Sequence, residues 1–119
     1  MYARALFDII HTSGDQILAL LVALEGGSDE FFASANTCAV VEEQLLLVAT
    51  TLAHLPPVVM LRLPQVDWRS WDAVFHALRE QAEPRRDLVW YGVCSLLPAT
   101  LVQLDQLRAR EPEWFEIQY

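Results

Sequence analysis

The sequence predicts an all-α fold, an up-down bundle of four main helices with a fifth short helix allowed. Three observations lead to this fold class. Apolar residues recur every three or four positions along most of the 119 residues, which is the spacing of one helix face. Proline and glycine stand between the periodic stretches. The one β-branched run, "VVMLRLPQ" from Val58, has no second run with which to form a sheet, so we treat it as a connector.

The first helix is expected over residues 2–25. The pair Gly26–Gly27 is expected to end it by supplying a left-handed cap, and Ser28 to cap a short helical turn that follows. The apolar stripe of this helix consists of Leu6, Ile10, Ile17, Leu20 and Leu24, widened by Leu18, Leu21 and Val22.

The second helix is expected over "NTCAVVEEQLLLVATTLAHL", with Asn36 as its cap and Pro56–Pro57 as its end. Its apolar positions alternate between spacings of four and three, which predicts one continuous buried face. These positions are Val41, Leu45, Val48, Leu52 and Leu55.

Asp67 and Asp87 are expected to cap the third and fourth helices, which "EPRR" separates. Pro98 falls inside the last apolar pattern, so we expect it to kink that helix rather than end it. The third helix buries Trp68, Trp71, Val74, Phe75 and Leu78, and the fourth buries Leu88, Trp90, Val93, Leu97, Leu101 and Leu104.

The helices predict one domain over residues 1–110, followed by an acidic, aromatic tail at 111–119. Apolar residues make up 54% of the chain, above the usual value of about 45–50%, so a homodimer is expected. No signal peptide and no uninterrupted apolar stretch of about 18 residues occurs, which predicts a cytoplasmic protein that does not cross a membrane.

Cys38 and Cys94 lie in apolar helical contexts and are predicted to be buried, reduced thiols without a disulfide. Neither cysteine has a histidine or a second cysteine at ligand spacing, so no metal and no cofactor is predicted.

Sixteen carboxylates face eight arginines and no lysine, for a net charge of −8, which is the opposite sign from most phosphate-binding proteins. The arginines are nevertheless segregated, which leaves a local anion site open. Five of the eight fall within residues 62–86, namely Arg62, Arg69, Arg79, Arg85 and Arg86.

His11, His54 and His76 each fit a surface or hydrogen-bonded helix histidine better than a catalyst. One pair is of more interest, because Arg69 and His76 lie seven residues apart and so share a helix face. An arginine that holds a phosphate beside a histidine that moves a proton would suit ribonuclease chemistry. Chance, however, makes such a pair common.

Five short phrases occur in a characteristic order: "GGSDEFFAS", "LLLVATTLAHLP", "LPQVDW", "RRDLVW" and "LLP". In this order and spacing the chain resembles the HepT-like branch of the HEPN superfamily, small helical bundles encoded beside minimal nucleotidyltransferases. The resemblance covers roughly residues 1–108. It implies a homodimer in which copies of the third and fourth helices line a shared cleft. In active members that cleft cuts RNA, and the partner enzyme modifies a tyrosine.

The family's catalytic positions are replaced in this chain. Alignment on "LPQVDW" puts Phe75 at the family's arginine position, and the family's histidine falls near Arg79 or Glu80. Thr50 stands where the second helix of the family carries a glutamate, and the modified tyrosine is also missing from its position. The structural positions remain, which suggests a fold kept after its reaction was lost.

The predicted function is therefore a non-catalytic HEPN-like homodimer that binds a nucleotide, RNA or a partner in a module with a minimal nucleotidyltransferase. Arg79, Arg85 and Arg86 are its predicted phosphate-binding residues. The alternative is an active HepT-like ribonuclease toxin that uses Arg69 and His76.

Overall fold

The computed structural model describes residues 3–23, 27–80 and 85–111. Over these residues the chain is helical and contains no strand, which confirms the all-α class. The first elements are α1 (Ala3–Val22), α2 (Gly27–Ala33), α3 (Ala35–Ala53), α4 (Pro57–Leu61) and α5 (Trp68–Glu80). One continuous helical rod follows, made of α6 (Arg85–Tyr91), a π-helical segment η1 (Gly92–Leu96) and α7 (Leu97–Arg110).

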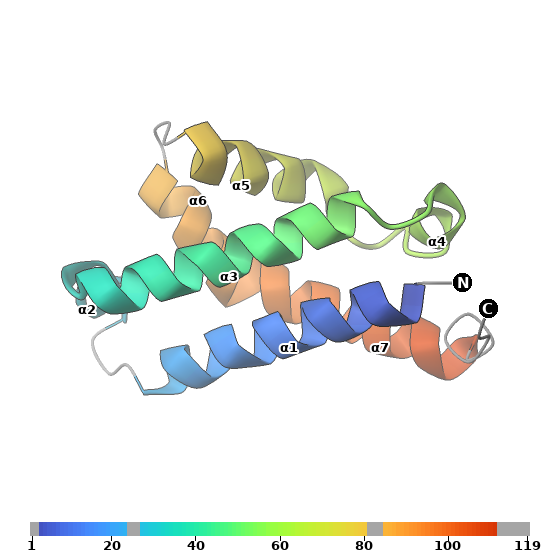
Figure 1. Cartoon of the computed structure of the whole chain (residues 1–119), viewed down its shortest axis with the longest axis horizontal. Coiled ribbons are helices and arrows are strands. Elements are labelled where there is room, and N and C mark those ends of the chain that lie inside the picture. Colours follow the sequence, from blue (N-terminus) through green and yellow to red (C-terminus); the bar gives the residue numbers. More distant parts are fainter. Residues whose placement is uncertain (1–2, 24–26, 81–84, 112–119) are drawn as a thin grey trace.

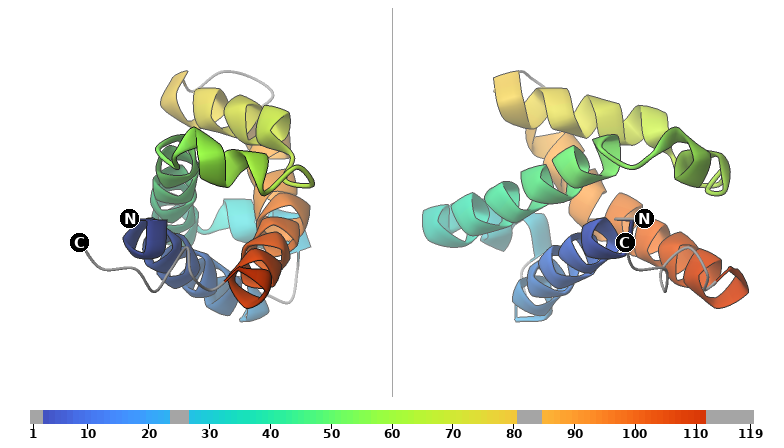
Figure 2. Two further views of the ribbon diagram at one scale, coloured as in Figure 1. Left: turned by 90° about the vertical axis from the view of Figure 1, so that its right-hand side faces the viewer. Right: turned by 45° about the vertical axis from the view of Figure 1, so that its right-hand side comes forward.

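The four long units, α1, α3, α5 and the rod, reverse direction from one to the next, as an up-down bundle does (Figure 1). α3 is central and packs against α1 on one side and α5 on the other. In the view of Figure 1 the rod crosses behind α3, and Figure 2 shows the same arrangement from two further directions. α6 contacts α5, and α7 contacts α1. The helix pattern in the sequence thus predicted both the number of long units and their order.

The core follows the predicted apolar faces closely. All five positions predicted for the second helix are buried, as are Ile10 and Ile17 of α1. Phe7 is fully buried although the predicted stripe left it out, while Leu6 beside it is partly buried. The remaining predicted positions that are buried are Trp71, Val74, Leu78, Val93, Leu97, Leu101 and Leu104, and those partly buried are Leu18, Leu20, Leu21, Trp68, Phe75, Leu88 and Trp90. Val22, predicted to widen the stripe of α1, is instead 85% exposed, and Leu24 lies outside the described residues.

The cap prediction is confirmed at α5 and wrong at α3. Asp67 accepts hydrogen bonds from the backbone N–H of Ser70 at 3.0 Å and from its hydroxyl at 2.6 Å. Asn36 lies inside α3, because Ser34 has the extended backbone of a cap and its hydroxyl accepts from the N–H of Thr37 at 3.4 Å. α2 ends at Ala33, so the single residue between the two helices takes the capping role.

Two further boundary predictions need correction. α6 begins at Arg85, so Asp87 lies in its first turn, where a carboxylate offsets the positive end of the helix dipole. α1 ends at Val22, and the positive φ of 68° at Gly27 belongs to the start of α2 rather than to a cap on α1. Gly26 and the side chain of Ser28 lie outside the described residues.

As predicted, the last helix continues past Pro98. The N–H of Leu97 donates to the carbonyl of Gly92, five residues back, which is the π-helical pattern. Because proline has no N–H, the α-helical bond that residue 98 would make is lost at this point. The helix therefore stays continuous and absorbs the proline by a local change of hydrogen-bond pattern.

The β-branched connector begins as a short helix. Pro56 and Pro57 stand at the start of α4, a position where the missing proline N–H costs nothing. Val59 of α4 is buried and so joins the core.

Two helical stretches, Arg4–Val22 and Arg86–Arg110, are long and apolar enough to cross a membrane by length and composition. Core helices of soluble proteins pass the same test, and 28% and 44% of the residues in the apolar 18-residue windows of these two stretches are buried inside the fold. The expectation that the chain does not cross a membrane therefore stays a prediction.

Candidate functional site

The predicted catalytic pair lies on the exposed face of α5. Nε2 of His76 is 3.5 Å from Oδ1 of Asp72, and its Nδ1 is 3.9 Å from Oε1 of Glu80. Arg69 is exposed and lies two turns away, roughly 10 Å along the helix axis. His76 is thus flanked by carboxylates one turn to either side, and the described contacts of His76 do not bring it to Arg69.

Phe75 packs with its neighbours on α5. Its ring meets the His76 ring edge-on at 5.5 Å, and the guanidinium of Arg79 lies 5.5 Å above its centre. A cation above an aromatic ring is stabilised by the negative charge of the ring face. Arg79 therefore has a packing partner on its own helix.

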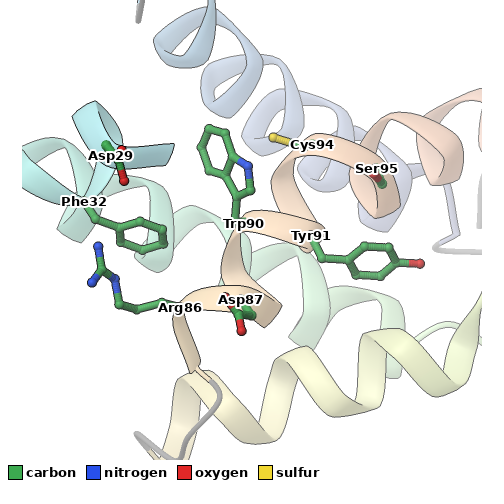
Figure 3. A pocket seen from close by; sticks show the side chains of 8 residues that line it. All are labelled: Asp29, Phe32, Arg86, Asp87, Trp90, Tyr91, Cys94 and Ser95. Carbon is green, nitrogen blue, oxygen red and sulfur yellow. The ribbon is translucent and has the colours of Figure 1, made fainter. Parts of the chain in front are cut away.

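A hollow of about 540 Å³ lies between α2 and the α6–η1 part of the rod. Its walls carry three aromatic rings, one guanidinium, two carboxylates, a thiol and two hydroxyls, one of them the phenol of Tyr91 (Figure 3). In chain order these residues are Asp29, Phe32, Arg86, Asp87, Trp90, Tyr91, Cys94 and Ser95.

Arg86 and the aromatic rings form a packed unit at one side of this hollow. The guanidinium of Arg86 lies 4.3 Å above the centre of the Phe32 ring. Phe32 in turn meets the fully buried Phe31 edge-on at 4.8 Å, and Trp90 lies 5.5 Å from Phe31 and 6.4 Å from Phe32. Because Phe31 is anchored in the core, the rings around it are held in place without a ligand.

The residues that α6 and η1 contribute follow a helical face, since they recur in adjacent pairs at every fourth position from Arg86. This spacing is present in "RRDLVWYGVCS", but the prediction from the sequence covered only the inward-facing side of this segment. Phe32, Trp90 and Tyr91 were therefore missed as site residues. The ring of Phe32 comes from α2, and its proximity to α6 had no sequence signal.

Of the three predicted phosphate-binding arginines, the two whose side chains are described, Arg79 and Arg86, pack against different rings. Arg79 packs on Phe75 of α5, whereas Arg86 packs on Phe32 and lines the hollow. The side chain of Arg85 lies outside the described residues, although its backbone begins α6.

Cys38 and Cys94 form no disulfide, and only Cys38 is partly shielded from solvent. Cys38 is half-buried and donates its thiol to Oε2 of Glu42 at 3.0 Å. Cys94 is exposed, which corrects the prediction that both thiols are buried, because it lies on the hollow side of η1. Partial desolvation nevertheless raises the pKa of the Cys94 thiol, so at neutral pH it is protonated and weakly nucleophilic.

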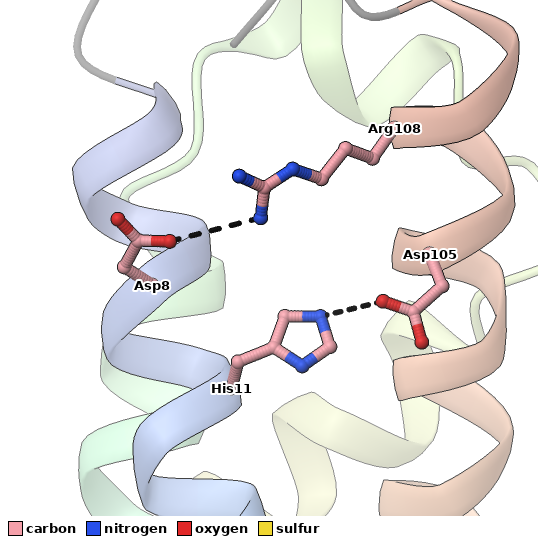
Figure 4. Close-up of polar contacts among 4 residues, drawn as sticks. All are labelled: Asp8, His11, Asp105 and Arg108. Atoms are coloured by element: carbon pink, nitrogen blue, oxygen red, sulfur yellow. Dashed lines mark ion pairs between the residues drawn. The ribbon is translucent and has the colours of Figure 1, made fainter.

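The other two histidines have structural contacts. Nε2 of His11 lies 2.8 Å from Oδ1 of Asp105, and beside this pair Asp8 faces Arg108 at 3.8 Å (Figure 4). Both pairs join α1 to α7. His54 contacts the carbonyl of Thr50 through Nδ1 at 2.7 Å, at the end of α3.

The described residues contain no group of three or more histidine, cysteine, aspartate or glutamate side chains that could hold a metal ion. No protein-family model, curated protein or solved structure matches the chain.

Proposed function

We propose that the chain is a non-catalytic, homodimeric nucleotide-binding subunit of the HEPN type, which works with a minimal nucleotidyltransferase. The nucleotide binds in the hollow between α2 and α6–η1. The observation that carries this proposal is the guanidinium of Arg86, held 4.3 Å above Phe32 in a hollow that Trp90 and Tyr91 also line.

The chemistry of these walls suits a nucleobase. A planar base stacks on aromatic rings or on a guanidinium plane, and each stacked base contributes about 1–3 kcal/mol. Asp29 and Asp87 are acceptors for amino groups of a base or for ribose hydroxyls. The volume of about 540 Å³ falls in the range of small-molecule sites.

The charges favour a mononucleotide over a long RNA. Two carboxylates line the hollow with Arg86, and the whole chain carries −8. Binding of long nucleic acids depends on many phosphate contacts with cationic side chains, which such a surface disfavours. One phosphate near Arg86, with Arg85 next to it in sequence, needs only a local cation.

The surroundings of His76 support a non-catalytic role. Cleavage of RNA by its 2′-hydroxyl needs a base and a cation at the scissile phosphate. Asp72 and Glu80 flank His76 and would repel that phosphate, while Arg69 lies two turns away.

The test is calorimetric titration of the purified protein with each of the four ribonucleoside monophosphates. Arg86→Ala removes the stacked guanidinium and should weaken binding about tenfold or more. Arg69→Ala is the matched control, because it removes an exposed arginine of α5 that does not line the hollow, and it should bind as the parent does. Equal affinity in both variants, or no binding by the parent, contradicts the proposal.

A second assay addresses the ribonuclease alternative. The parent, His76→Ala and Arg69→Ala proteins are incubated with a mixed RNA pool, and we expect no cleavage by any of them. Cleavage by the parent that is lost in both variants would establish Arg69 and His76 as an active site and reject the non-catalytic role.

A further inference from the structure

A second hollow, of about 260 Å³, lies where α5 faces α3 and α4. α5 contributes residues at the helical spacing of three, four and seven: Trp68, Trp71, Asp72 and Phe75. α3 presents Ala49 and Ala53 on the opposite side. Large rings that face alanines leave space between the helices, because neither alanine side chain reaches across.

The walls of this hollow offer carbon to a ligand rather than hydrogen-bond donors. The indole N–H of Trp68 donates to the carbonyl of Leu63 at 3.2 Å, and that of Trp71 donates to Oγ1 of Thr100 at 2.8 Å. Both donors are therefore occupied within the fold. Asp72 is the charged residue of the lining, and its side chain is 73% exposed, so the carboxylate lies at the mouth.

The local electrostatics favour a positive ligand. Asp72 is the charged residue of the lining, which includes no cationic side chain among the described residues. Aromatic rings also attract cations; the Phe75 ring already has the guanidinium of Arg79 5.5 Å above it, although Arg79 does not line the hollow. Ala49 and Ala53 lie in the last turns of α3, whose carboxyl end carries the negative pole of the helix dipole. The opposing pole of α5 is offset by its capping carboxylate, Asp67.

We propose that this hollow binds a small organic cation with apolar substituents, of the quaternary ammonium class. The apolar groups fill the space between the alanines and the rings, and the charge lies beside the Asp72 carboxylate. His76, whose Nε2 lies 3.5 Å from that carboxylate, is on the exposed side of the same helix. The ligand class and the lining residues differ from those of the nucleotide hollow, so this site does not depend on the proposed function.

The probe is choline, compared with 3,3-dimethylbutan-1-ol, which has the same shape and no charge. Binding is followed by calorimetry on the full chain. Choline should bind saturably, and the neutral alcohol should bind about tenfold more weakly, because it lacks the attraction between a cation and the rings. Equal binding of the two compounds, or no saturation by choline up to about 50 mM, overturns the proposal.

Two variants locate the site. Asp72→Asn should weaken choline binding about threefold, as expected for one exposed charge pair, while Asp15→Asn, an exposed carboxylate of α1, should leave it unchanged. Ala53→Leu should abolish binding by filling the hollow, provided that its circular dichroism matches the parent. Choline affinity unchanged in Asp72→Asn, or retained by a folded Ala53→Leu protein, places the cation elsewhere and rejects the proposal.

Discussion

The hydrogen bond between Trp71 and Thr100 is the contact most open to a quantitative test. It joins α5 to α7 across 29 residues of sequence at 2.8 Å. Trp71 is 3% exposed and Thr100 is 2% exposed, so water cannot readily replace either partner. We predict that Thr100→Val, which keeps the shape and removes the acceptor, destabilises the fold by about 1–3 kcal/mol, because the buried indole N–H loses its partner.

The partner variant separates the bond from the packing. Trp71→Phe removes the donor and part of a buried ring, so its cost adds a cavity to the lost bond and should reach about 2–4 kcal/mol. In the double variant neither partner remains to be left unsatisfied. The double variant should therefore cost less than the sum of the two single changes, by about 1 kcal/mol.

The assay is urea unfolding followed by far-ultraviolet circular dichroism, which does not depend on the tryptophan that is removed. All four proteins are compared at one concentration, because a dimer's stability depends on concentration. A Thr100→Val protein within about 0.3 kcal/mol of the parent, or an additive double variant, would refute the view that this bond couples the two helices.

Three further outcomes are expected. Sedimentation equilibrium at micromolar concentration should show a dimer, and only the 13.5 kDa species would reject it. Alkylation without reductant should modify both Cys38 and Cys94. Because the pKa of the Cys94 thiol is raised, its reactive thiolate forms only at more alkaline pH, and its alkylation rate should rise there. A disulfide-linked peptide pair in the mass spectrum would contradict this prediction. Asp67→Ala should lower the free energy of unfolding by about 1 kcal/mol at neutral pH. Hydrogen bonds from Ser70 lower the pKa of Asp67, so this contribution should fade only as the pH falls through that lowered pKa; a deficit that persists in strong acid would show that the ionised cap is not its cause.

The helix faces could be predicted because each is set by local periodicity. The second predicted helix is the clearest case, since all its predicted positions are buried, from Val41 within α3 to Leu55 just after the end of α3. Periodicity fails where two apolar neighbours compete, and "LF" at Leu6 and Phe7 is such a place. Both residues fit a helical stripe, and the packing against other helices selects Phe7.

Caps were less predictable because several residues near each helix end can serve. Ser34 and Asn36 are both good caps, and the choice between them depends on where α2 ends. Asp67 had no competitor at the start of α5, so the prediction was confirmed there.

The candidate sites differ in whether their residues lie on one helix or on two. Arg69 and His76 could be predicted as a pair because both carry suitable chemistry and their spacing lies within one helix. The hollow that contains Arg86 depends instead on Phe32, which α2 supplies from a distant part of the sequence. A pattern within one helix cannot indicate which ring from another helix will cover it.

The π-helical segment links the hollow to the core. Gly92 packs against α3 so closely that an added Cβ would lie 3.3 Å from Cδ2 of Leu45. Pro98 removes the N–H that an α-helix would use four residues beyond Cys94, and the bond from Leu97 to Gly92 takes up the change. At Gly92 the rod thus approaches Leu45 of α3 on one side, while the neighbouring Tyr91 and Cys94 line the hollow on the other. Gly92 and Pro98 both lie within the rod, and neither ends it.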